Sequence, residues 1–130
     1  FSTEVDSLIN QFPSYDFFYI HYKDADAAGE DGNFEAKVTA LENLDKYIPK
    51  IRALNPDVLI IAGDHATPSI MASHSWHPVP LCLSSPFTLG EGVESFDEDS
   101  FRNGSLGTMP AVNIMNLALS HARKLTKFGA

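Results

Sequence analysis

Residues 57–68 read Asp-Val-Leu-Ile-Ile-Ala-Gly-Asp-His-Ala-Thr-Pro, and this stretch decides the fold that we expect. The apolar run from Val58 to Ile61 is rich in β-branched side chains, which is typical of a strand buried on both faces of a parallel sheet. Asp64 and His65 follow directly after Gly63. In open α/β sheets, ligands bind beyond the carboxyl ends of the strands, so this pair stands where such folds carry out their chemistry.

The pair of Asp64 and His65 has two interpretations. A carboxylate and an imidazole side by side both donate lone pairs to Zn or Mn, which suits a divalent metal site. The alternative is a loop whose aspartate caps the following turn, with Thr67 and Pro68 continuing it. The pair alone leaves both interpretations open.

The composition limits the classes of function. The 130 residues are 44% hydrophobic and 20% charged, which fits one globular domain over residues 1–130. The formal net charge of −8 argues against nucleic acids and membranes as partners, whereas bound metal ions would permit an anionic substrate. Cys82 is the only cysteine, and no apolar run approaches the roughly 20 residues that span a bilayer. We therefore expect a cytoplasmic protein without disulfides. Because the chain opens at Phe1, we also expect a fragment.

The apolar periodicity predicts helices that alternate with strands. The expected helices cover residues 3–11, 33–48, 49–54 and 110–127, and the expected strands cover residues 15–22, 58–61 and 79–84. Ser2 or Thr3 is the expected cap of the first helix and Asn33 of the second, and a kink or a break is expected at Pro49. Pro80 favours the start of a strand or a sheet edge. Residues 85–108 are expected to form a long surface excursion with one short helix near residues 97–102.

Two polar stretches hold further candidate ligands. Residues 23–33 are expected to form an acidic loop that contains Asp26 and Glu30. The alternating acidic pattern of a calcium-binding loop is absent there, so we do not expect a calcium site of that type. The alternative to a role in metal binding is an acidic loop exposed to solvent. His74 and His77 lie three residues apart in a second loop, where an isolated histidine is more often a hydrogen-bonded surface group.

Three segments resemble the metal-binding motifs of the archaeal-type, cofactor-independent phosphoglycerate mutases. They are Lys23-x-x-Asp26-x-Ala28-Gly29-x-Asp31-Gly32-x-Phe34-Glu35, Ala62-Gly63-Asp64-His65-Ala66-Thr67-Pro68 and His74-Ser75-x-x-Pro78-Val79-Pro80. Residues 104–107 and the ending at 127–130 are also similar. The resemblance covers nearly the whole chain in the same order. It implies membership of the alkaline-phosphatase superfamily, with a doubly wound, mostly parallel α/β sheet that carries helices on both faces.

The resemblance also implies a metal site and a reaction. Two divalent ions are expected, with manganese first and magnesium, cobalt or zinc as alternatives. Asp64 and His65 would bind the ion beside a serine nucleophile, and Asp26 and His74 would bind the other ion. The complete enzyme would interconvert 2-phosphoglycerate and 3-phosphoglycerate in glycolysis through a phosphoserine. Its oligomeric state is not predicted.

Two departures from the family pattern qualify these expectations. Glu30 stands where the family carries a histidine ligand, and His77 is a candidate to compensate. The serine nucleophile, one metal aspartate and the substrate-binding arginines of the family lie upstream of residues that match this chain. We therefore expect a C-terminal part of a mutase that is inactive alone and contains no catalytic nucleophile. The alternatives are a related metal-dependent phosphatase or phosphonopyruvate-processing homologue, and a non-catalytic remnant, which Glu30 favours.

Overall fold

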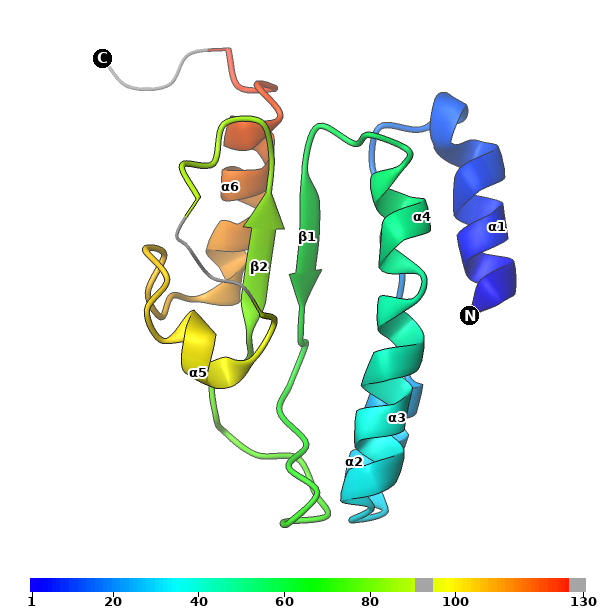
Figure 1. Ribbon diagram of the computed structural model, residues 1–130. Coiled ribbons are helices and arrows are strands. Elements are labelled where there is room, and N and C mark those ends of the chain that lie inside the picture. The colour runs from blue at the N-terminus through cyan, green and yellow to red at the C-terminus, as the bar shows by residue number, and fades with distance from the viewer. Residues whose placement is uncertain (91–94, 127–130) are drawn as a thin grey trace. The chain divides into compact units, whose positions relative to one another are not determined.

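The structure of the protein is a computed structural model, and it describes residues 1–90 and 95–126 (Figure 1). The chain divides into two compact units. The first comprises Phe1–Asn55 and His65–Trp76, and the second comprises Pro56–Asp64 and His77–Ala130. The described part of the first unit is built from helices, whereas that of the second carries a sheet with short helices. Part of the predicted excursion (91–94) and the mutase-like ending (127–130) lie outside the described residues.

The helices of the first unit are α1 (Ser2–Gln11), α2 (Asp24–Glu30), α3 (Phe34–Asp45) and α4 (Ile48–Arg52), with a 3₁₀ turn, η1 (Phe12–Ser14), after α1. The predicted break at Pro49 is confirmed, because α3 ends before it and α4 begins with it in the first turn. The Asn33 cap is also confirmed, since its side chain accepts a hydrogen bond from the Ala36 N–H. The cap predicted at Ser2 or Thr3 was wrong: Phe1 holds the N-cap position, and no side chain bonds there.

Helix α2 replaces the acidic loop that was predicted for residues 23–33. It ends in a Schellman motif, in which Asn33 N–H donates to the Ala28 carbonyl and Gly32 N–H to the Gly29 carbonyl, both at 3.0 Å. Gly32 has a positive φ of 67°, the left-handed conformation that this motif requires. The sequence pattern missed the helix because α2 is short and has no apolar stripe. Packing against α3 (Figure 1) stabilises it instead.

The strand predicted for residues 15–22 is not found. Tyr15 has extended dihedral angles, but no residue of the segment belongs to a strand. Aromatic side chains favour strands because they fit a pleated, half-buried surface, which requires a neighbouring strand. Here Tyr15, Phe17 and Tyr19 stay 64%, 62% and 75% exposed, so that surface is missing in the described part of the chain.

The sheet of the second unit contains β1 (Leu59–Ala62) and β2 (Leu81–Ser84). The strands pair antiparallel, with Ile60 opposite Leu83. The described residues therefore do not confirm the expected doubly wound, mostly parallel sheet. The expected burial of the first strand on both faces is not confirmed either, because β1 pairs only with β2 among residues 1–90 and 95–126, and its residues are intermediate or exposed. Pro80 stands directly before β2, as predicted, and its carbonyl accepts the Gly63 N–H at 3.2 Å.

The short helices of the second unit are α5 (Glu98–Phe101), η2 (Ala111–Asn113) and α6 (Ile114–His121). Helix α5 confirms the predicted short helix. Helix α6 ends earlier than the predicted residue 127, because Arg123 adopts a left-handed φ of 57° and Lys124 N–H donates back to Leu119. Arg123 and Lys124 therefore lie beyond the helix end. No helix among the described residues is long and apolar enough to span a membrane.

The buried core of the described residues is small and lies in the first unit. Its buried apolar side chains are Val5, Leu8, Ala28 and Ala40, of which Val5 is fully buried. Thr67 is a polar residue that is also buried, with only 4% of its surface exposed. Burying a hydroxyl is costly unless it is hydrogen-bonded. The partners of Thr67 therefore indicate where the polar interior of this unit lies.

We expect Gly29→Ala to destabilise the chain by about 1–3 kcal/mol, because overpacking a tight contact outweighs the gain in helix propensity. An added Cβ would lie 2.5 Å from the Thr67 carbonyl oxygen and 3.0 Å from its Cγ2. Urea denaturation followed by circular dichroism measures the change. Gly104→Ala is the control, since a Cβ added there would lie 3.3 Å from its nearest neighbour, the Phe101 carbonyl oxygen. Equal stability of the two variants would contradict the close packing of α2 on Thr67.

Candidate metal centre

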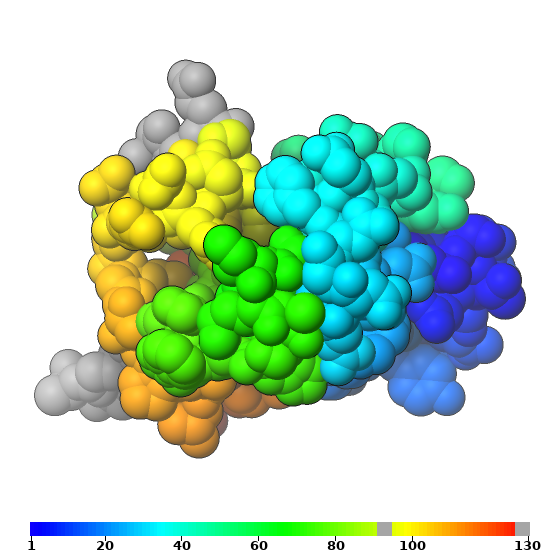
Figure 2. Space-filling view, turned by 90° about the horizontal axis from the view of Figure 1, so that it is seen from below, coloured from blue at the N-terminus to red at the C-terminus, as the bar shows by residue number. Residues whose placement is uncertain are grey.

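The segment His65–Trp76 folds back on itself beside α2 and α3. An isolated antiparallel bridge joins Ala66 and Ser75, and the Ser75 N–H donates to the Ala66 carbonyl at 2.8 Å. Between them, the Met71 N–H donates a hydrogen bond to the Pro68 carbonyl at 2.9 Å, which closes a turn. Figure 2 shows this segment (green) against the ends of α2 and α3 (cyan). The bridge holds the backbone that carries His65, Thr67 and His74 in one place.

Helix α2 supplies the carboxylates. Asp26 and Glu30 are four residues apart, so their side chains leave the same face of the helix. The Asp26 Oδ1 atom lies 3.6 Å from Nε2 of His74 and 3.8 Å from Nδ1 of His65. Glu30 Oε1 lies 3.3 Å from the same Nε2 of His74. The two imidazole rings are 4.0 Å apart between centroids. Four of the five predicted ligands are therefore neighbours in the first unit.

Thr67 connects these side chains. Its hydroxyl donates to Asp26 Oδ1 at 2.5 Å and lies 3.1 Å from Nδ1 of His65. Its carbonyl accepts a hydrogen bond from the Lys37 ammonium of α3. Gly29 allows the Thr67 carbonyl to lie close to α2, because glycine has no side chain that would meet it. Sequence reasoning missed the roles of Thr67 and Lys37, although Thr67 is part of the motif that contains Asp64 and His65.

The charge of Asp26 is strongly stabilised. A hydrogen bond from the Lys23 ammonium and a second from the Thr67 hydroxyl lower the pKa of Asp26 to about 2. Its side chain is 13% exposed, so these bonds also offset its partial burial. The Lys23 ammonium contacts the Asp26 carboxylate although the Lys23 side chain is 58% exposed. Asp26 is therefore ionised at every pH at which a metal would bind.

The donor set fits a divalent transition metal. Asp26, His65 and His74 each offer a ligand atom, and these atoms lie within 4.8 Å of one another. Imidazole nitrogens with a carboxylate suit Zn, Mn, Co or Fe, whereas Mg and Ca prefer oxygen alone. Glu30 brings a further carboxylate to His74, which adds an oxygen ligand and a negative charge.

Two other predicted residues belong to the second unit. Asp64 ends the segment Pro56–Asp64, and His77 begins the next segment of that unit. Their part in the site is a proposal. His121 is also in the second unit, where its Nδ1 lies 2.8 Å from the Ser85 hydroxyl.

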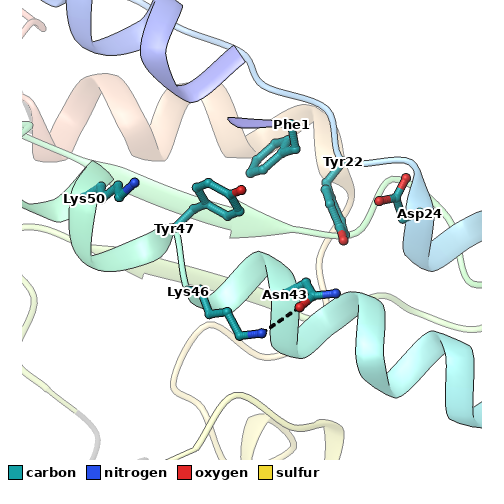
Figure 3. Close-up of a pocket in the computed structure, with 7 residues that line it drawn as sticks. All are labelled: Phe1, Tyr22, Asp24, Asn43, Lys46, Tyr47 and Lys50. Atoms are coloured by element: carbon teal, nitrogen blue, oxygen red, sulfur yellow. Dashed lines mark hydrogen bonds between the residues drawn. The ribbon is translucent and has the colours of Figure 1, made fainter. Parts of the chain in front are cut away.

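A separate pocket of about 460 Å³ lies in the first unit (Figure 3). The rings of Tyr22 and Tyr47 both meet the Phe1 ring edge-on, with centroids 4.9 and 5.4 Å from it. Lys46 and Lys50 lie at its rim and Lys46 donates to Asn43 at 2.7 Å. None of the predicted metal ligands lines this pocket. The metal chemistry and this hollow are therefore different features.

Comparisons with known proteins connect this geometry to a family. The model of the metalloenzyme superfamily matches residues 2–121. Probable 2,3-bisphosphoglycerate-independent phosphoglycerate mutases are similar: that of Aquifex aeolicus is 49% identical over 127 residues, and that of Thermotoga petrophila is 50% identical over 127 residues. Each match covers 98% of this chain but only 31% and 32% of the relative. The chain thus spans about a third of the length of these relatives.

A solved structure agrees with this assignment. A protein from Pyrococcus horikoshii matches with a TM-score of 0.90 and 29% sequence identity, over 97% of this chain and 39% of that chain. The match of the family model extends from α1 to the end of α6 and includes every candidate ligand. Members of such a family are expected to use divalent metal ions, which is the chemistry that the donor set fits. The chain belongs to the metalloenzyme superfamily.

Proposed function

We propose that this chain is the C-terminal, metal-binding part of a 2,3-bisphosphoglycerate-independent phosphoglycerate mutase. The whole enzyme would interconvert 2-phosphoglycerate and 3-phosphoglycerate in glycolysis, in the cytoplasm. The observation that carries the proposal is the convergence of Asp26, His65 and His74 in a chain about half identical to proteins named as such mutases. The net charge of −8 is compatible with an anionic substrate, because bound metal ions would reverse the local field.

The chain's own residues would hold two divalent ions, with manganese as the expected metal. Asp26, Glu30 and His74 would hold one ion, and Asp64 with His65 the other. Ligands of two neighbouring ions would lie in one cluster, and the 3.8 Å between His65 Nδ1 and Asp26 Oδ1 supports this arrangement. When bound, such ions neutralise phosphate and activate an oxygen nucleophile. The serine nucleophile and the substrate-binding residues would come from the remainder of the enzyme.

We further propose that both units form one α/β domain, over residues 1–130, within a doubly wound, mostly parallel sheet of the longer enzyme. Support comes from the exposed aromatic residues of segment 15–22 and from β1, which has a single partner strand in the part of the chain that the structure describes. Further strands beside these segments would bury the side chains that this part of the chain leaves exposed.

The 130-residue chain should bind Mn²⁺ through this centre. Asp26→Asn or His74→Gln should weaken binding by at least about 10-fold, because each removes a ligand or its charge. Isothermal titration calorimetry measures the affinity. Asp31→Asn is the matched control, since Asp31 is an exposed acid directly after α2. Unchanged affinity in both ligand variants would contradict the proposed centre.

Whether Glu30 binds the metal distinguishes the proposal of a mutase part from that of a non-catalytic remnant. If Glu30 is a ligand, Glu30→Ala should lower Mn²⁺ affinity by about 10-fold or more, whereas Glu30→His should retain binding, because imidazole also binds manganese. The same calorimetric titration tests both variants. An affinity that Glu30→Ala leaves unchanged would favour the remnant.

The chain alone should not turn over 3-phosphoglycerate or an aryl phosphate with Mn²⁺ present. Removing a nucleophile from a hydrolase typically lowers kcat on the order of a millionfold. A steady-state assay of the purified chain measures this. Turnover that rises in proportion to chain concentration and is lost in Asp64→Asn would show that the nucleophile lies within these residues.

A further inference from the structure

Lys37 connects α3 to the segment that carries two of the candidate ligands, His65 and His74. Its ammonium donates a hydrogen bond to the backbone carbonyl of Thr67, which lies 30 residues further along the chain. We propose that Lys37 is a positioning residue, which holds this segment against α2 and thereby raises the affinity of the metal centre. The effect on the metal rests on the proposed function, whereas the positioning itself is a property of the metal-free chain.

The Thr67 carbonyl is enclosed where Lys37 meets it. Thr67 is only 4% exposed, and a Cβ added to Gly29 of α2 would lie 2.5 Å from the carbonyl oxygen. The same Cβ would lie 3.2 Å from the Lys37 Nζ atom, so the carbonyl and the ammonium lie together against the backbone of α2. A buried carbonyl without a hydrogen-bond partner is strongly unfavourable. The Lys37 ammonium supplies that partner from α3.

The contact is a firm link between two elements. The Lys37 side chain belongs to a half-buried residue, and holding its ammonium at one point costs rotamer freedom and part of its hydration. A hydrogen bond from a charged donor offsets such costs better than one between neutral groups, because it is about twice as strong. Lys37 therefore fixes the Thr67 peptide unit relative to α2 and α3.

A displacement of Thr67 would reach the candidate ligands. Its hydroxyl donates to Asp26 Oδ1 at 2.5 Å, and His65 stands two residues before it. The residue directly before Thr67 is bridged to Ser75, whose N–H donates to it at 2.8 Å, and His74 is the neighbour of Ser75. The arrangement of Asp26, His65 and His74 therefore depends on the place of this one peptide unit. Groups that orient metal ligands typically change metal affinity by about 10- to 100-fold.

The sign of the change in metal affinity separates positioning from charge. Lys37 carries a positive charge in the same unit as the ligands, and like charges repel. Removing the ammonium would by charge alone strengthen the binding of a cation. Loss of positioning acts in the opposite direction, because a displaced segment no longer presents His65 and His74 beside Asp26. A weaker affinity in a variant that lacks the ammonium is therefore evidence for positioning.

Isothermal titration calorimetry with Mn²⁺ tests this on the folded 130-residue chain. Lys37→Met, which keeps most of the length of the side chain and loses the ammonium, should bind Mn²⁺ about 10- to 100-fold more weakly. Lys37→Arg, which retains the charge and the donors, should recover part of this loss. Lys46→Met is the matched control, because it removes the same charge from an exposed lysine whose ammonium bonds Asn43. An affinity of Lys37→Met that equals or exceeds that of Lys46→Met would overturn the inference.

Amide hydrogen exchange of the metal-free chain tests the positioning itself. In Lys37→Met the Ser75 N–H should exchange at least about 10-fold faster, because its hydrogen bond to the Ala66 carbonyl opens more often. The Ala122 N–H, which donates to Ala118 in the second unit, should keep its rate. Equal acceleration at both amides, or none at Ser75, would contradict the positioning role.

Two further outcomes are decided by the same measurements. Lys37→Gln, which is also uncharged and too short to keep the contact, replaces Lys37→Met in both experiments if the latter does not fold. A wild-type chain that binds no Mn²⁺ would refute the proposed function, whereas the exchange rate of the Ser75 N–H would still decide whether Lys37 positions the segment.

Discussion

The hydrogen bond from the Thr67 hydroxyl to Asp26 joins two parts of the chain that are 41 residues apart. One part is α2, a short acidic helix with no apolar stripe, and the other is the bridged segment that carries His65 and His74. Gly29 allows the contact because only a residue without a side chain fits beneath the Thr67 carbonyl. The Lys37 ammonium binds the same carbonyl from α3. This contact fixes the Asp26 carboxylate of α2 beside the segment that carries His65 and His74.

The same contact sets the electrostatics of the site. Asp26 receives hydrogen bonds from Lys23 and Thr67, and both favour its charged form. A fixed negative charge beside two imidazoles prepares a site for a cation rather than for an anionic substrate. In a chain with a net charge of −8, a bound cation would locally offset the repulsion of an anion. The metal centre and the acidic composition therefore belong to one explanation.

Local signals in the sequence predicted much of the fold. The Asn33 cap, the break at Pro49 and the position of Pro80 before β2 follow from the chemistry of single residues. Helix α2 was missed because its stability comes from packing and from the Gly32 motif rather than from periodicity. The segment 15–22 was predicted as a strand because aromatic propensity reflects a pairing surface that the described part of the chain does not supply.

The candidate ligands were found through residue types and motif order, whereas the role of Thr67 was missed. Its function depends on two contacts across the fold, and one threonine in a turn carries no pattern that indicates them. The central claim is that Asp26, His65 and His74 hold a divalent ion. Anomalous diffraction from crystals grown with Mn²⁺, recorded at the manganese absorption edge, tests it most directly. We expect a peak within bonding distance of a carboxylate oxygen of Asp26 and an imidazole nitrogen of His74, with His65 bound to the same ion or to a neighbouring one. A fully occupied manganese peak elsewhere, with these three side chains unbound, would contradict it.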